Sequence, residues 1–98
     1  MSNDKSNKLK LTLVEAQPPG YLSVYAKALW LSAKGNWKAA HELVQDLDDR
    51  SAALIHAYLH RVEGDLSNAR YWYAKANEKM PAVDLQTEWE LLAQRFGS

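Results

Sequence analysis

The spacing of apolar residues predicts helices from residue 21 onward. Tyr21, Val24, Ala28 and Leu31 recur at intervals of three and four, which places them on one face of a helix. Comparable stripes follow, separated by short polar breaks. Because the breaks are short, consecutive helices are expected to fold back as antiparallel neighbours. The pattern predicts an all-α fold with five short helices, over residues 21–34, 37–47, 50–63, 66–80 and 85–96.

The first twenty residues follow a different pattern. Leu9, Leu11 and Leu13 alternate with polar residues, which is the period of a half-buried strand. A lone strand has no partner for its main-chain hydrogen bonds, so we expect an arm that pairs outside itself, lies along the helices or stays loose. Two prolines and a glycine end the arm at residues 17–20. We therefore expect an extended N-terminal arm at residues 1–20, mobile over 1–8, and one helical domain at residues 21–98.

Two of the helix breaks are alike. Gly35-Asn36 and Gly64-Asp65 are offset by 29 residues, and glycine allows the positive φ of a tight turn. Each glycine has an alanine seven residues before it and another five residues after it, and such small residues let two helices approach closely. The sequence therefore contains an internal repeat of a helix hairpin. The four alanines are Ala28, Ala40, Ala57 and Ala69.

The repeat resembles the tetratricopeptide repeat (TPR) family. The second unit matches that motif at Ala57, Gly64, Asp65, Ala69, Tyr73, Ala76 and Pro81. The first unit matches through Ala28, Gly35, Asn36, Trp37 and Ala40, but it lacks the later alanine and proline, and it is shorter than the usual repeat of about 34 residues. At His56 and His60 the family usually has leucine and an aromatic residue. The runs at residues 56–61 and 68–73 also resemble a group of small bacterial proteins with no assigned activity.

The resemblance implies a non-catalytic protein–protein interaction module. In TPR proteins the first helix of each hairpin lines a concave groove that holds a peptide or a partner helix. In this chain the fifth helix would follow the two hairpins and cap the stack. The leucine arm and the outward-facing aromatic residues leave open that the partner is a second copy of this chain, which would make a homodimer. Carried over to this chain, the groove residues are Tyr25, Leu29 and Ser32 in the first helix and Leu54, Tyr58 and Arg61 in the third.

Aromatic residues are frequent, with four Trp, five Tyr and one Phe. Most of them fall on the inward stripes, but adjacent helical residues point about 100° apart, so Tyr71, Trp72 and Tyr73 cannot all face one core. For the same reason Trp30 cannot face the core together with both of its neighbours, Leu29 and Leu31. Trp30 and Trp72 are therefore candidate anchors for a partner or for self-association. The alternative is that they pack beneath the arm or the fifth helix.

The three histidines form a second candidate site. His56 and His60 are four residues apart and share one helix face, and His41 could approach them from the preceding helix. Glu42 or Glu63 could add an oxygen ligand. The simpler interpretation is a set of histidines that hydrogen-bond between helices in a mixed core. The alternative is a metal-binding or small-ligand site, since two histidines at this spacing can hold one ion.

The composition of the chain excludes several classes of function. Twelve basic residues balance twelve acidic ones, so no basic surface for nucleic acid is expected. The chain has no cysteine, no apolar run long enough for a bilayer and no apolar leader near its start, which favours a cytoplasmic protein without membrane contact. No phosphate-binding loop, nucleophile motif or paired acid and base is present. We therefore expect neither catalysis nor a cofactor.

Overall fold

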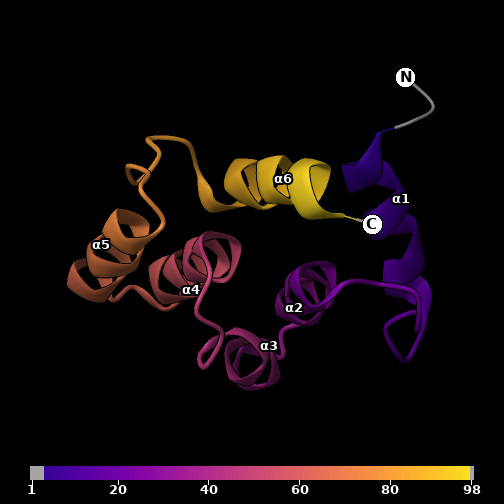
Figure 1. Ribbon diagram of the computed structural model, residues 1–98. Helices are drawn as coiled ribbons and strands as arrows, with labels where there is room; N and C mark the ends of the chain where they lie inside the picture. The colour runs from indigo at the N-terminus through magenta and orange to yellow at the C-terminus, as the bar shows by residue number, and fades with distance from the viewer. Residues whose placement is uncertain (1–3, 98) are drawn as a thin grey trace.

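The computed structural model describes residues 4–97, and over that range it contains helices and no strand (Figure 1). The prediction of an all-α fold is confirmed. Residues 1–3 lie outside the described part, and with them the start of the segment expected to be mobile. The elements are α1 (Lys5–Leu11), the 3-10 turn η1 (Thr12–Val14), α2 (Val24–Ala33), α3 (Trp37–Val44), α4 (Arg50–Glu63), α5 (Leu66–Lys75) and α6 (Leu85–Phe96).

Each of these α-helices begins after a short polar side chain. Such a side chain accepts a hydrogen bond from a free amide of the first helical turn, which would otherwise have no partner. Because each cap stands directly before an apolar stripe, the local sequence determines where the helices start. The capping residues are Asp4, Ser23, Asn36, Asp49, Asp65 and Asp84.

The helices pack in sequential pairs, α2 with α3 and α4 with α5. The breaks inside the two pairs have the same geometry, because Gly35 has a φ of 82° and Gly64 a φ of 85°. In each break the glycine amide donates to the oxygen three residues back, and the following amide donates to the oxygen five residues back. The four alanines of the sequence repeat, Ala28, Ala40, Ala57 and Ala69, are all 0% exposed.

Three helix limits differ from the prediction by three residues or more. One belongs to the helix predicted to reach Leu47, which ends at Val44. The first long helix starts at Val24 rather than near Tyr21, because Ser23 caps it, and Tyr21 is 75% exposed. The helix predicted to reach Met80 ends at Lys75. There Asn77 adopts a left-handed conformation with a φ of 60°, which turns the chain before Pro81 is reached.

Residues 5–14 of the N-terminal segment are helical, so the prediction of an extended arm is wrong over that range. The alternation of leucines covers only five residues, and it coincides by chance with a short helix. In a helix, residues four apart share a face. Accordingly, Leu9 is 1% exposed and Leu13 packs against the core, whereas Leu11 points outward and is 75% exposed. This segment packs against α2 and α6.

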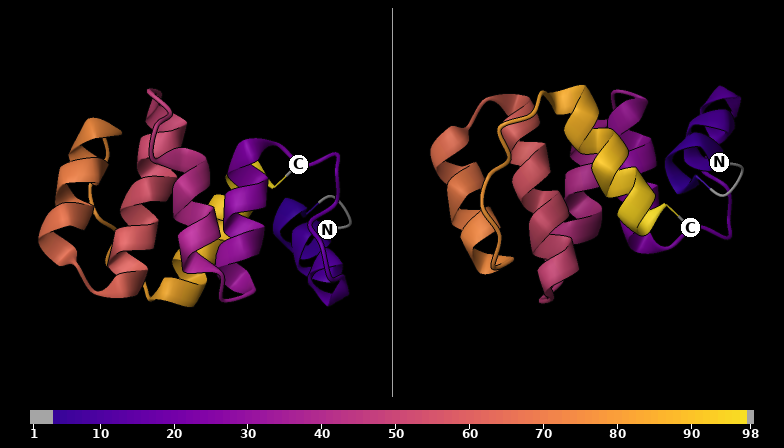
Figure 2. Two further views of the ribbon diagram at one scale, coloured as in Figure 1. Left: turned by 90° about the horizontal axis from the view of Figure 1, so that it is seen from below. Right: turned by 90° about the horizontal axis from the view of Figure 1, so that it is seen from above.

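Helix α6 crosses over α2 and α4 on one side of the layer formed by helices α2 to α5 (Figure 2). The core lies between this layer and α6. Central helix α4 is buried along most of its length, from Ala52 to His60. None of the helices within residues 4–97 is long and apolar enough to cross a bilayer.

Candidate functional site

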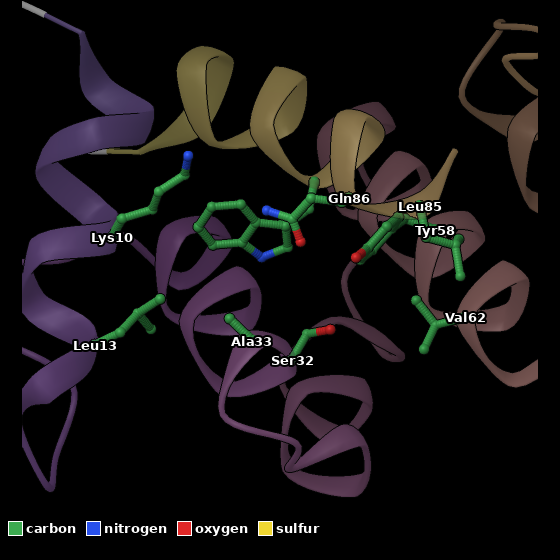
Figure 3. A pocket seen from close by; sticks show the side chains of 9 residues that line it. Lys10, Leu13, Ser32, Ala33, Tyr58, Val62, Leu85 and Gln86 are labelled. Atoms are coloured by element: carbon green, nitrogen blue, oxygen red, sulfur yellow. The ribbon is translucent and has the colours of Figure 1, made fainter. Parts of the chain in front are cut away.

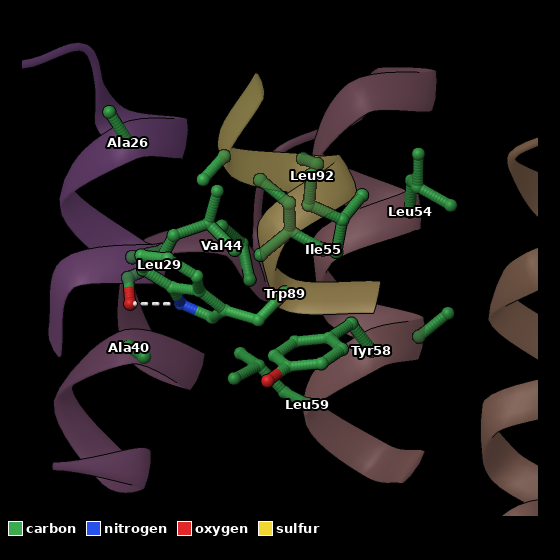
Figure 4. Close-up of a cluster of buried hydrophobic side chains, with 14 of the residues drawn as sticks. Ala26, Leu29, Ala40, Val44, Leu54, Ile55, Tyr58, Leu59, Trp89 and Leu92 are labelled. Carbon is green, nitrogen blue, oxygen red and sulfur yellow. Dashed lines mark hydrogen bonds between the residues drawn. The ribbon is translucent and has the colours of Figure 1, made fainter. Parts of the chain in front are cut away.

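The surface predicted to hold a partner is covered by α6. Trp89, only 3% exposed, lies beside Leu29 and Tyr58 (Figure 4), and its indole Nε1 donates a hydrogen bond to the main-chain oxygen of Leu29 at 2.9 Å. Leu29 is 0% exposed and Leu54 is 3% exposed. Leu29 is covered by Trp89 of α6, so the prediction that it faces an open groove is wrong. Leu54 lines a second cleft of about 310 Å³, together with Leu91 and Leu92 of α6.

Arg61 is also engaged within the chain. Its guanidinium forms an ion pair of 2.7 Å with Glu88 of α6, and it donates a second hydrogen bond to the oxygen of Val83. The hydroxyl of Tyr73 donates to the other oxygen of Glu88 at 2.5 Å. Glu88 is 3% exposed, so the carboxylate that Arg61 binds is buried and internal. Burial and the hydrogen bond to Glu88 raise the pKa of Tyr73.

Tyr25 lies on α2 near the carboxyl end of α6. Its hydroxyl donates to Asp49 Oδ2 at 3.0 Å, and its ring centroid is 5.6 Å from that of Phe96. The hydrogen bond connects the start of α2 to the residue that caps α4. Tyr25 is therefore held by neighbours inside the chain, although part of its side chain remains accessible.

Trp30 is buried, so the prediction that it is an exposed anchor is wrong. It is 2% exposed, and its indole Nε1 donates to Thr12 Oγ1 at 3.0 Å. The N-terminal segment therefore covers it, which was the alternative interpretation of this residue. Trp72 is half-buried, and its ring stacks on that of His56 with centroids 3.9 Å apart.

A cleft of about 490 Å³ remains beside α6, between η1, α2 and α4 (Figure 3). Two of the predicted groove residues, Ser32 and Tyr58, line it and direct their hydroxyl groups into it. Burial raises the pKa of Tyr58 to about 12, so its hydroxyl stays protonated. The remaining lining residues are Lys10, Leu13, Ala33, Val62, Leu85, Gln86 and Trp89.

The structure brings all three histidines together. One ring nitrogen of each lies within 4.8 Å of the others, and the Nε2 atoms of His41 and His56 are 3.0 Å apart. Burial lowers the pKa of His56 to about 4, with smaller contributions from the other two histidines. Burial also lowers the pKa of His41. At neutral pH the His41 and His56 rings are therefore uncharged.

Two features of these sites go beyond what the sequence pattern indicates. Glu88 reads as a surface carboxylate, yet it stands four residues before Leu92 and three after Leu85, which places it beside the apolar stripe of α6. Thr12 is the partner of Trp30, but a polar residue in an expected strand gives no signal of a contact with an indole 18 positions away.

Compared with models of protein families, with curated proteins and with solved structures, the chain matches none of them.

Proposed function

We propose that this protein is a non-catalytic binding module in which two TPR-like hairpins present a cleft to a segment of a partner protein. The matched glycine breaks and the four buried alanines support a repeated hairpin, α2–α3 followed by α4–α5. In this arrangement α6 is a closing helix that lies along the concave side. The binding surface is then the part of that side that α6 leaves open.

The observation that carries the proposal is the cleft lined by Ser32 and Tyr58. Its volume of about 490 Å³ falls within the range of roughly 300–1,000 Å³ typical of ligand sites. The resemblance to TPR proteins implies that both residues face a partner. The cleft therefore coincides with the end of the predicted groove that stays accessible.

The lining indicates what kind of segment would fit. Leu13, Val62 and Leu85 provide apolar walls that suit one or two apolar side chains. The hydroxyl of Ser32 and the amide of Gln86 can hydrogen-bond to the main chain of an entering peptide. Lys10 at the rim is paired with Glu90 at 2.8 Å, so the cleft carries little net charge. The partner is accordingly a short, mainly apolar peptide segment.

Site-specific photocrosslinking tests the proposal, because it captures a partner whose identity is unknown. A benzophenone amino acid placed at Val62, which is 38% exposed at the cleft, is expected to yield one discrete adduct in cells. The same group at Leu47, which is 37% exposed and lies outside the cleft, is the matched control. Ala33→Trp, a change at an exposed wall position, is expected to fill the cleft and abolish the adduct.

The mass and the position dependence of the crosslinked adduct distinguish the possible results. No adduct from Val62, or the same adduct from Val62 and Leu47, refutes a partner site in this cleft. An adduct of twice the mass of the chain identifies a second copy as the partner. An adduct of another mass identifies a different protein, which mass spectrometry then names.

A further inference from the structure

The cluster of His41, His56 and His60 lies on the other side of α4 from α6, where α3, α4 and α5 meet. These are the three histidines of the chain, and they are separated by 15 and 4 positions. The ring centroids of His41 and His56 are 4.6 Å apart, and those of His56 and His60 are 4.8 Å apart. Folding therefore gathers every imidazole of the protein around one point.

We propose that this cluster binds one divalent late transition-metal ion, such as Zn²⁺, through one ring nitrogen of each histidine. Imidazole nitrogens are preferred ligands of Zn²⁺, Cu²⁺ and Ni²⁺. Two nitrogens on one tetrahedral ion, each about 2.0–2.1 Å from the metal, are about 3.3 Å apart. The Nε2 atoms of His41 and His56 are already 3.0 Å apart. The nitrogen of His60, within 4.8 Å of both, needs only to swing inward to complete three ligands.

Glu63 has the position of an orienting carboxylate. His60 Nδ1 lies 2.8 Å from Glu63 Oε1, so this nitrogen carries the proton and Nε2 keeps its lone pair for the metal. Metal-binding histidines commonly donate their second ring nitrogen to a carboxylate in this way. Glu63 thus determines which His60 nitrogen carries the proton, without being a ligand itself.

Two tryptophans enclose the cluster. Trp37 stacks on His41 with centroids 4.7 Å apart, and its Nε1 is fixed by a hydrogen bond of 2.7 Å to the oxygen of Leu59. Trp72, which lies on α5 whereas Trp37 lies on α3, stacks on His56. The buried Nδ1 of His56 has no hydrogen-bond partner, so protein contacts do not satisfy this ring completely. His41 is half-buried, so the cluster is in contact with solvent at this residue.

Titration of tag-free protein, stripped with a chelator, with Co²⁺ tests the proposal. We expect one Co²⁺ per chain, with visible absorption typical of a tetrahedral nitrogen site and with quenching of the Trp37 and Trp72 fluorescence. Zn²⁺ should displace it. His41→Gln, a change at the half-buried edge, should abolish stoichiometric binding while circular dichroism stays helical. Glu63→Gln should weaken binding by roughly tenfold or more.

Trp72→Phe is the matched control, because a phenyl ring keeps the wall of the site and alters no nitrogen ligand. It should bind Co²⁺ as the wild type does, with part of the quenching lost. Absence of stoichiometric binding by the wild-type chain overturns the proposal, and so does unchanged binding by folded His41→Gln. Neither result bears on the cleft beside α6, because no histidine lines that cleft.

Discussion

Arg61 of α4 and Glu88 of α6 form an ion pair of 2.7 Å in which the side chains are only 16% and 4% exposed. Removing one partner of a buried pair leaves an uncompensated charge, which typically costs about 3–5 kcal/mol. We expect Glu88→Ala to lower the free energy of unfolding by that amount, since Tyr73 loses its acceptor as well. Urea denaturation measures it. Glu90→Ala, which breaks an exposed pair with Lys10, should cost less than about 1 kcal/mol, and equal losses would contradict a buried anchor.

Trp89 should be the main apolar anchor of α6. Truncation of a buried tryptophan typically costs about 3–5 kcal/mol, and Trp89→Ala also removes the hydrogen bond to Leu29. We expect thermal unfolding at a markedly lower temperature and faster proteolysis between α5 and α6. Leu91→Ala serves as the control, because Leu91 is 58% exposed on the same helix. Similar effects of both changes would show that α6 is not docked as described.

The helical form of the N-terminal segment has its own test. Leu9→Ala should destabilise the protein by about 2–3 kcal/mol, because its side chain is buried against the core. Leu11→Ala should change stability by less than about 0.5 kcal/mol, because Leu11 is exposed. In a strand, Leu9 and Leu11 would face the same way and the two changes would have comparable effects. Chemical denaturation of the two variants distinguishes the conformations.

Stability should fall in mild acid when no metal is present. The pKa of His56 is about 4 in the folded state and about 6.5 in an unfolded chain, so the unfolded state binds the proton more tightly. Its contribution is complete above pH 6.5 and is lost as the pH falls through 4, with a total on the order of 3 kcal/mol. His41 shifts in the same direction. Unfolding temperatures measured in chelator over this range give the slope.

His56→Leu is the comparison for this pH dependence, because it removes the titrating ring while keeping an apolar side chain. Its stability should vary less between pH 6.5 and 4.5 than that of the wild type. Equal slopes for the two proteins would mean that the buried imidazole does not control acid sensitivity.

Local signals in the sequence determine much of the helical framework. The prediction of a helix over residues 50–63 is confirmed at both ends, because Asp49 caps its start and Gly64 takes the left-handed conformation at its end. The start of α6 after Asp84 is confirmed for the same reason. These signals act between neighbouring residues, so a single sequence shows them directly.

Contacts between distant segments are harder to predict. The stripe of α6 indicates that one face is buried, but periodicity does not say which helices cover that face. The groove assignment of Leu29 fails for this reason, since it assumes that α6 continues the stack instead of crossing it. The alternating leucines mislead because five residues are too few to separate a strand from a helix.

The histidine cluster could be predicted in part from the sequence. Spacing places His56 and His60 on one face of a helix, which the structure confirms by stacking their rings. The approach of His41 follows from the short break that returns the chain from α3 to α4. The role of Trp37 and Trp72 as walls does not follow from the pattern, because it depends on how α5 is rotated against α4.

The hydrogen bond from the indole of Trp89 to the main-chain oxygen of Leu29 joins positions 60 residues apart. In contrast, each hairpin closes through a break of a few residues. Bringing distant segments together costs more chain entropy than closing a short turn, so the hairpins are expected to assemble first and α6 to dock last. Until α6 arrives, the apolar sides of α2 and α4 are open to water. During synthesis this intermediate would persist until α6 emerges from the ribosome, and at this stage the chain is most exposed to aggregation or to capture by a chaperone.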